Sequence, residues 1–221
     1  MRIHLNRTAV LAAAILAVVV LAGCGGSTSS TQSASKTGQQ STGANAVDRA
    51  FVQQMIPHHK MAVQMAQMAK SQAQHPAVKT LAASIITSQD HEITEITEIT
   101  AIARKLGVMP DQMPVNGSMS AHMAGDDQTL GLSMQQTGMS MNMSTLNGAK
   151  PFDRMFIDMM IPHHQGAIRM ARIELAKGSD QRLRSIAHGI IAAQASEIGR
   201  MNAWRNTWFG ASSPAGGVPT A

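Results

Sequence analysis

The sequence Met-Ile-Pro-His-His stands at residues 55–59 and again at residues 160–164. Both stretches belong to a longer frame that repeats without a gap at an offset of 105 residues. The frame keeps polar residues as well as apolar ones, in the pairs Asp48/Asp153, Phe51/Phe156, Met55/Met160, His58/His163, His59/His164, Met65/Met170, Gln89/Gln194 and Glu92/Glu197. Packing alone would require only the apolar positions. The sequence therefore predicts an internal duplication whose polar residues meet across a pseudo-twofold axis.

Apolar residues that recur at intervals of three and four predict helices. The expected helices span about residues 47–71, 76–106, 151–177 and 180–208. The connection inside each pair of helices is short, whereas residues 107–150 form a long crossover between the pairs. Two hairpins joined by one long crossover is the connectivity of a ferritin-like four-helix bundle, so we expect an all-α fold.

The N-terminus has the pattern of a lipoprotein signal peptide over residues 1–23. Basic residues precede an apolar run that is too short to span a membrane and that ends just before Cys24, the single cysteine of the chain. We expect cleavage before Cys24, lipidation of its thiol, and an extracytoplasmic protein anchored by lipid to the bacterial cell membrane. Residues 24–46 are small and polar and are expected to form a flexible tether.

The remaining boundaries follow from the duplication. The helical domain is expected to cover residues 47–208, with repeats over about 47–106 and 151–208. Residues 209–221 are rich in Gly, Pro and Ser and are expected to form a disordered tail.

The repeated Met and His residues predict a metal site, because Met55 lies three residues before His58 and four before His59, on one helical surface. The second copy repeats this spacing. The predicted ligands are Met55, His58, His59, Met65, Met160, His163, His164 and Met170. Thioether sulfur is a soft ligand, so copper, foremost Cu(I), is the expected ion, with other transition metals as alternatives.

Polar residues on the second helix of each hairpin are predicted to support the ligands. A carboxylate can accept the second ring N–H of a ligating histidine and so fix its tautomer. The predicted supporting residues are Gln89, Glu92, Gln194 and Glu197. The alternative is that these histidines and glutamates satisfy one another in the core without a metal.

Pro57 and Pro162 leave two interpretations open. Inside a helix each removes one backbone hydrogen bond and bends the chain beside the histidines, and the continuous apolar stripe favours this position. At the first turn of a helix each would place the histidines near a positive helix end.

The crossover is rich in methionine. Its candidates for a second metal-binding segment are Met119, His122, Met123, Met139, Met141 and Met143. Methionine also fills irregular gaps, which is the alternative explanation. Because residues 110–147 show little periodic apolar surface, we expect the helices to form without them.

Other functions have less support. The net charge is +5, but no basic run is interleaved with aromatic residues, so we expect no nucleic-acid partner. A ferritin-like redox enzyme is an alternative, although a di-iron site would use Glu-x-x-His motifs that the sequence lacks. A structural or partner-binding envelope protein without metal is a third possibility, and no particular protein partner is indicated. No hydrolase constellation is recognisable.

The doubled frame resembles the domain of unknown function 305 family of bacterial envelope proteins. The resemblance extends from Asp48 to about Trp208 and includes both Met-Ile-Pro-His-His motifs. It implies a ferritin-like helical bundle and, for some members, copper binding or copper tolerance in the periplasm or cell envelope. The positions that match the family motif are Met55, His58, His59, Met65, Met160, His163, His164 and Met170.

Overall fold

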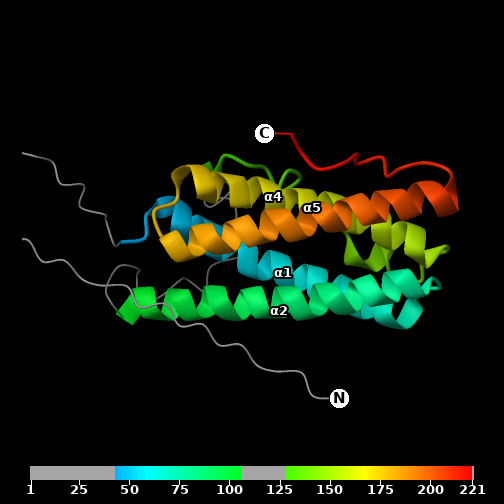
Figure 1. Ribbon diagram of the computed structural model, residues 1–221, viewed down its shortest axis with the longest axis horizontal. Helices are drawn as coiled ribbons and strands as arrows, with labels where there is room; N and C mark the ends of the chain where they lie inside the picture. The colour runs from blue at the N-terminus through cyan, green and yellow to red at the C-terminus, as the bar shows by residue number, and fades with distance from the viewer. Residues whose placement is uncertain (1–42, 106–127, 221) are drawn as a thin grey trace, which may run out of the picture. The chain divides into compact units, whose positions relative to one another are not determined.

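The computed structural model of the protein describes residues 43–105 and 128–220. The long helices are α1 (Ala46–Gln72), α2 (Pro76–Lys105), α4 (Phe152–Lys177) and α5 (Gln181–Phe209), and a 3-10 turn, η1, covers Met143–Thr145. No β-strand occurs in either described range. The helices pair as α1 with α2 and α4 with α5, and the two hairpins meet through α1 and α4 (Figure 1). The predicted all-α bundle of two hairpins is confirmed.

The helix ends are fixed by side chains that satisfy free backbone groups. Asn45 and Asp48 form a capping box at the start of α1, in which Asn45 Oδ1 accepts hydrogen bonds from the backbone of Val47 and Asp48 at 2.8 and 3.0 Å. Asp180 caps α5, and Gly210 ends it in the left-handed conformation, with φ of 83°.

Two aspartates join the hairpins reciprocally. Asp153, in the first turn of α4, accepts hydrogen bonds from the backbone N–H groups of Gln74 and His75 before α2, at 2.9 and 2.8 Å. Its repeat equivalent Asp48, in the first turn of α1, accepts from the backbone of Ser179 and Asp180 before α5, at 2.9 and 3.0 Å. The start of each helix therefore lies at the end of the other, so α1 and α4 run antiparallel. The two sets of hydrogen bonds are equivalent between the repeats, as the predicted pseudo-twofold axis requires.

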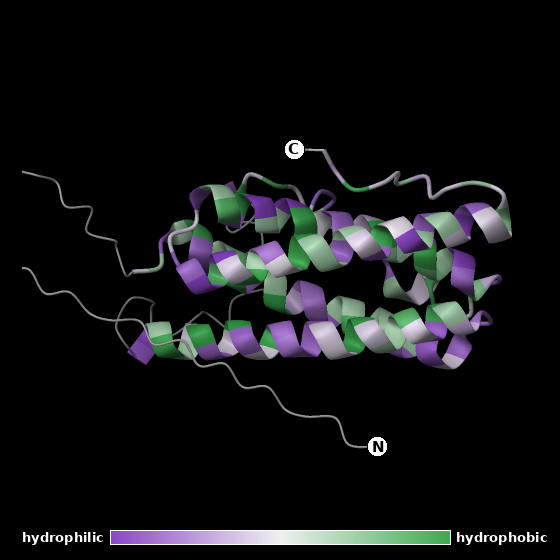
Figure 2. Ribbon diagram, in the orientation of Figure 1, coloured by the Kyte–Doolittle hydropathy of each residue, from purple (hydrophilic) through white to green (hydrophobic). Residues whose placement is uncertain are grey.

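The core consists of two hydrophobic clusters separated by polar residues. One contains Phe51 and draws on residues 44–55, 96–103, 167–171 and 183–190 of the helices, together with Leu130. The other contains Phe156 and draws on residues 62–85, 152–161 and 198–201, together with Leu146 and Ile168. We call these the Phe51 cluster and the Phe156 cluster. Hydrophobic and hydrophilic residues alternate along every helix, as amphipathic packing requires (Figure 2).

On each long helix, two polar side chains lie between the parts that contribute to the two clusters. We call this set the polar layer; it consists of His58, His59, Gln89, Glu92, His163, His164, Gln194 and Glu197. The four histidines are fully buried, and Gln89, Gln194 and Glu197 are also buried. The duplicated polar residues therefore converge at mid-height of the bundle, where seven of the eight are buried and the side chain of Glu92 is 16% exposed.

Pro57 and Pro162 lie inside α1 and α4, not at helix starts. Each helix continues on both sides of its proline, one residue before the first histidine of the motif. The second interpretation of the sequence, in which each proline begins a helix, is wrong.

The expectation of a disordered tail needs correction. α5 extends to Phe209, and the residues after it are held against α4 and α5. Gln165 donates to the backbone carbonyls of Ala215 and Gly217 at 2.8 and 2.6 Å, and Arg172 donates to that of Pro219 at 2.7 Å. Side-chain donors on the helices bind backbone carbonyls, so the order of this segment does not depend on its own sequence being apolar.

The crossover is also more closely integrated than its weak periodicity suggested. Leu130 and Leu146 are 3% and 0% exposed and belong to the Phe51 and Phe156 clusters, respectively. Single anchoring leucines carry no periodic signal, which is why the sequence pattern missed them.

Candidate metal centre

The centre of the polar layer is a pair of stacked histidines. The imidazoles of His58 on α1 and His163 on α4 lie with ring centroids 3.6 Å apart and planes inclined by 32°, and both side chains are fully buried. They occupy equivalent positions of the two repeats, so the pseudo-twofold axis passes between them. The neighbouring histidines lie farther out, at 6.1 Å between the His58 and His59 rings and 6.4 Å between the His163 and His164 rings.

The outer histidines are each bound to a glutamate of the same hairpin. His59 Nε2 lies 2.6 Å from Glu92 Oε2, and His164 Nε2 lies 2.7 Å from Glu197 Oε2. In the neutral imidazole this contact places the proton on Nε2 and the lone pair on Nδ1. The predicted pairing of glutamates with histidines is therefore present in the structure.

His58 is oriented by a different partner. Its Nε2 donates to the backbone carbonyl oxygen of Thr137, at 3.0 Å. A carbonyl can only accept, so the proton is on Nε2 and the lone pair on Nδ1, as in His59 and His164. Sequence reasoning missed Thr137, because a backbone contact from a crossover leaves no mark in residue type.

The polar layer contains a concentration of unsatisfied buried atoms. The atoms without a hydrogen-bond partner are Nδ1 of His58, His59 and His164, both ring nitrogens of His163, Oε1 of Gln89, and both amide atoms of Gln194. Buried polar atoms normally have partners, and isolated exceptions often mark a ligand or ion. Here the exceptions are mainly imidazole nitrogens, which are metal ligands when neutral.

The environment keeps the central pair neutral. Burial lowers the pKa of His58 well below 6.5, and the adjacent imidazoles of His59 and His164 add to this effect. Burial likewise lowers the pKa of His163, together with His58, His164 and His59. Neutral rings keep the lone pairs that metal coordination needs.

The predicted methionine ligands lie on both sides of the polar layer, and all four are fully buried. Met55 and Met170 belong to the Phe51 cluster, whereas Met65 and Met160 belong to the Phe156 cluster. The structure thus divides the predicted ligand set into two pairs of thioethers flanking the histidines. Within residues 43–105 and 128–220, no group of three or more His, Cys, Asp or Glu side chains is arranged to hold a metal ion.

The predicted second metal-binding segment lies only partly within the described residues. Met139, Met141 and Met143 are half-buried, and the last two pack against the Phe156 cluster. This packing agrees with the gap-filling explanation for these two side chains. Met119, His122 and Met123, like Cys24, lie outside the described residues.

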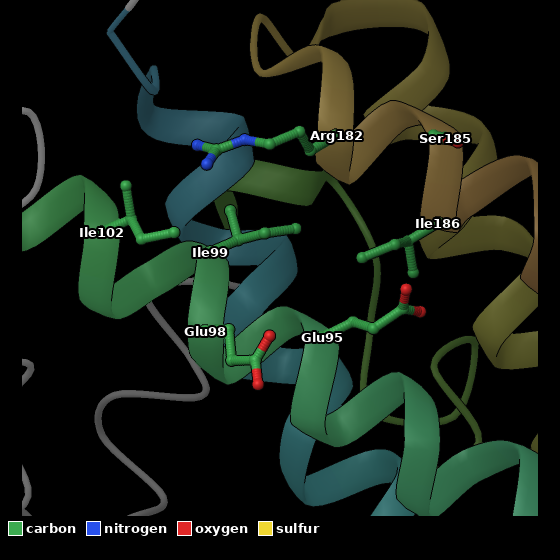
Figure 3. Close-up of a pocket in the computed structure, with 7 residues that line it drawn as sticks. All are labelled: Glu95, Glu98, Ile99, Ile102, Arg182, Ser185 and Ile186. Atoms are coloured by element: carbon green, nitrogen blue, oxygen red, sulfur yellow. The ribbon is translucent and has the colours of Figure 1, made fainter.

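An open groove elsewhere on the bundle is distinct from the polar layer. Glu95, Glu98, Ile99 and Ile102 of α2 face Arg182, Ser185 and Ile186 of α5 across a volume of about 330 Å³ (Figure 3). Its lining contains neither histidine nor methionine, so the groove does not contribute soft ligands.

None of the helices in the two described ranges combines the length and apolar character that crossing a membrane requires.

Several solved structures resemble this fold. The Cu(I)-bound structure of CopM is 31% identical, with a TM-score of 0.58, and the match covers 73% of this chain and 97% of CopM. The Cu(II)-bound form of CopM matches with 32% identity, a TM-score of 0.57 and the same coverage. A DUF305 protein from Streptomyces coelicolor has the same fold, with a TM-score of 0.60, 21% identity, and coverage of 76% of this chain and 96% of that one.

A shorter match links the chain to the uncharacterized protein L153 of Acanthamoeba polyphaga mimivirus, which is 40% identical over 52 residues. This stretch spans 34% of the viral protein and 24% of the present chain. The family model described as "Domain of unknown function (DUF305)" matches residues 48–215, which include both hairpins and the crossover. The duplicated bundle therefore belongs to the DUF305 family.

Proposed function

We propose that the protein binds copper, as Cu(I), in the polar layer, and buffers it at the cell envelope. The observation that carries the proposal is the buried pair His58 and His163, whose rings stack at 3.6 Å and whose free nitrogens have no protein partner. Buried thioethers flank the pair on both sides. Neutral imidazole and thioether together form the soft donor set that favours Cu(I). The likeness to CopM, which has been solved with Cu(I) and with Cu(II), supports copper as the ion.

The charge of the ion is a further consideration, because a cation in a dry core needs compensation. Glu92 and Glu197 are the carboxylates of the polar layer, and each contacts an imidazole through a short hydrogen bond. A carboxylate on the far side of a ligating ring raises its basicity and offsets positive charge. The glutamates therefore suit a bound cation better than a metal-free core.

The test is an anaerobic titration of the purified protein with Cu(I), with Cu(II), Zn(II) and Fe(II) as competing ions. Changing His58 and His59 to Ala should weaken Cu(I) binding about as much as changing His163 and His164. The quadruple variant should show little further loss, because residues that act as one unit are not additive.

The matched controls are two exposed histidines outside the polar layer, His91 on α2 and His188 on α5. Changing both to Ala should leave Cu(I) affinity unchanged. Independent, additive losses from the two motif pairs would indicate separate sites on the two hairpins. Unchanged affinity in the quadruple variant would refute the proposal and favour a histidine layer that is structural only.

We also propose that the bundle is held at the membrane through a lipid on Cys24. Small residues directly precede this single cysteine after a short apolar run, which supports processing as a lipoprotein. Cys24→Ala should release the protein from the membrane fraction or stall its processing, whereas Ser27→Ala should do neither. A Cys24→Ala protein that is still processed and membrane-bound would contradict the anchor.

A further inference from the structure

One segment of the crossover approaches the histidine pair more closely than side chains would normally permit. We call residues 133–138 the strap; it is closed by hydrogen bonds from Thr137 N to Ser133 O and from Gly138 N to Gln135 O, at 2.9 and 3.1 Å. Arg169 on α4 donates to Gln136 O at 3.0 Å and ties the strap to the helix. The strap is therefore a compact turn fixed against α4.

Two glycines make this approach possible. A Cβ atom on Gly166 of α4 would lie 1.9 Å from Thr137 O, which no real side chain tolerates. On the strap, Gly138 has φ of +75°, and a Cβ there would lie 2.8 Å from the Cα of His163. The strap and α4 each have a glycine where they meet, so their backbones contact each other without an intervening side chain.

The contact delivers one hydrogen bond to the polar layer. The Thr137 carbonyl oxygen points to Nε2 of His58 and leaves Nδ1 of that ring buried and unpartnered. His59 and His164 reach the same state through Glu92 and Glu197. The strap therefore does for His58 what a glutamate does for each outer histidine, without adding charge.

The arrangement breaks the symmetry of the duplication. Gly166 corresponds to Met61 in the first repeat, so the glycine that admits the strap occurs in one repeat and not in the other. His163, the repeat equivalent of His58, accordingly has neither ring nitrogen bonded. The proton position of His58 is therefore fixed by a hydrogen bond, whereas neither ring nitrogen of His163 has a hydrogen-bond partner within bonding geometry.

We propose that the strap is a positioning element of the metal centre, in which Thr137 O fixes His58 as the Nε2–H tautomer and so keeps the lone pair of Nδ1 available for a metal ion. His163 has no such hydrogen-bond partner, so we expect both of its neutral tautomers in the metal-free protein. This inference rests on the proposed copper function.

The test combines a spectroscopic measurement on the metal-free protein with a binding measurement. Long-range ¹H–¹⁵N correlation at pH 7.5 should show His58 as a single Nε2–H tautomer and His163 as a mixture. Gly166→Ala should displace the strap, convert His58 to a tautomer mixture, and lower Cu(I) affinity roughly 10- to 100-fold, as loss of a ligand-orienting partner does.

The matched control is Gly199→Ala on α5, where an added Cβ meets nothing within 4 Å. It should change neither the His58 signals nor the affinity. If Gly166→Ala does not fold, Gly138→Ala replaces it, because an added Cβ on Gly138 creates a clash at the same contact from the strap side. Gly138→Ala should then give the His58 tautomer mixture and the loss of Cu(I) affinity expected for Gly166→Ala.

The outcomes separate this inference from the function on which it rests. A wild-type His58 with its proton on Nδ1 would overturn the role of the strap, whether or not any variant folds. The role would equally be overturned if Gly166→Ala abolished the fixed tautomer but retained full Cu(I) affinity. If the wild-type protein bound no Cu(I) although His58 showed the expected tautomer, the copper function would fail while the contact itself stood.

Discussion

At the scale of single residues, the bundle contains buried groups whose protonation differs between the folded and unfolded chain. Burial lowers the pKa of His58 and His163, so the folded protein keeps both rings neutral. Glu174 at the end of α4 shows the opposite shift, because burial, reinforced by the adjacent Asp48, raises its pKa to about 9. Asp48 itself is ionised, since hydrogen bonds from Ser179 and the backbone of Asp180 outweigh burial and lower its pKa.

The histidine pair should make the metal-free protein sensitive to acid. Below pH 6.5 the unfolded chain takes up protons on His58 and His163 that the fold excludes, so the free energy of unfolding should fall as the pH decreases through this range. Urea unfolding between pH 5 and pH 8 measures the effect. Cu(I) affinity should weaken over the same range, because protons compete for the ligands. A stability that rises towards pH 5 would contradict the neutral pair.

Glu174 gives a prediction of opposite sign. The folded protein keeps this carboxyl protonated up to about pH 9, whereas the unfolded chain releases the proton near pH 4.5, so its contribution falls as the pH rises between these values. Glu174→Gln should therefore become more stable relative to wild type as the pH increases from 5 to 8. Denaturant unfolding at both pH values tests this, with the exposed Glu98→Gln as the control. A constant difference would show that Glu174 is ionised in the fold.

At the scale of helices and loops, the ends of the elements depend on partners in the other hairpin. Asp153 binds two backbone N–H groups before α2, and its Oδ2 also contacts His75 Nδ1 at 2.5 Å. The His75 ring in turn stacks on Trp208 of α5, with centroids 3.8 Å apart and planes inclined by 3°. The start of α2 is thereby tied to the other hairpin twice.

Asp153→Ala should lower the free energy of unfolding by about 1–3 kcal/mol, the range expected when a charged cap with several hydrogen bonds is lost. The exposed Asp90→Ala on α2 serves as the control and should change stability by less than about 0.5 kcal/mol. Chemical denaturation of the metal-free protein measures both. An effect of Asp153→Ala no larger than the control would show that the cap contributes little.

The crossover gives a second prediction at this scale. Leu146 is fully buried in the Phe156 cluster, so Leu146→Ala should destabilise the fold by about 2–5 kcal/mol, as other cavity-forming changes do. Met134→Ala, at a side chain that is 42% exposed, is the matched control. If both variants were equally stable, the crossover would be dispensable, as its weak periodicity first indicated.

At the scale of the whole molecule, periodicity and duplication were sufficient to predict the helices, the hairpins and the convergence of the polar layer. Each of these follows from residues that share a helical face or a repeat position. The pairing of His59 with Glu92 and of His164 with Glu197 was predictable for the same reason. The division of the four methionines, which the sequence predicted as ligands, between two clusters was not predictable. The spacing of residues along one helix does not determine how far a side chain lies from the symmetry axis.

Besides the buried leucines of the crossover, the contacts that the sequence did not reveal are made by the backbone. Thr137 O reaches His58 across 79 residues, and the tail presents carbonyls to Gln165 and Arg172. Neither contact depends on the side chain of the residue that accepts the bond. The replacement of Met61 by Gly166 in the second repeat was the one available signal, because a glycine at an interior helical position weakens the helix and calls for a packing explanation.

The reciprocal aspartate caps have a consequence for the history of such a chain. One hairpin carries both halves of the contact, an aspartate that caps and a helix start that is capped, so it is complementary to a copy of itself. Two separate hairpins could satisfy these bonds only as a symmetric pair, and only at concentrations where they associate. Fusion removes the dependence on concentration. It also allows the halves to diverge: identical hairpins would have to carry the same residue at positions 61 and 166, whereas the fused chain has a methionine at one and, at the other, the glycine that admits the strap.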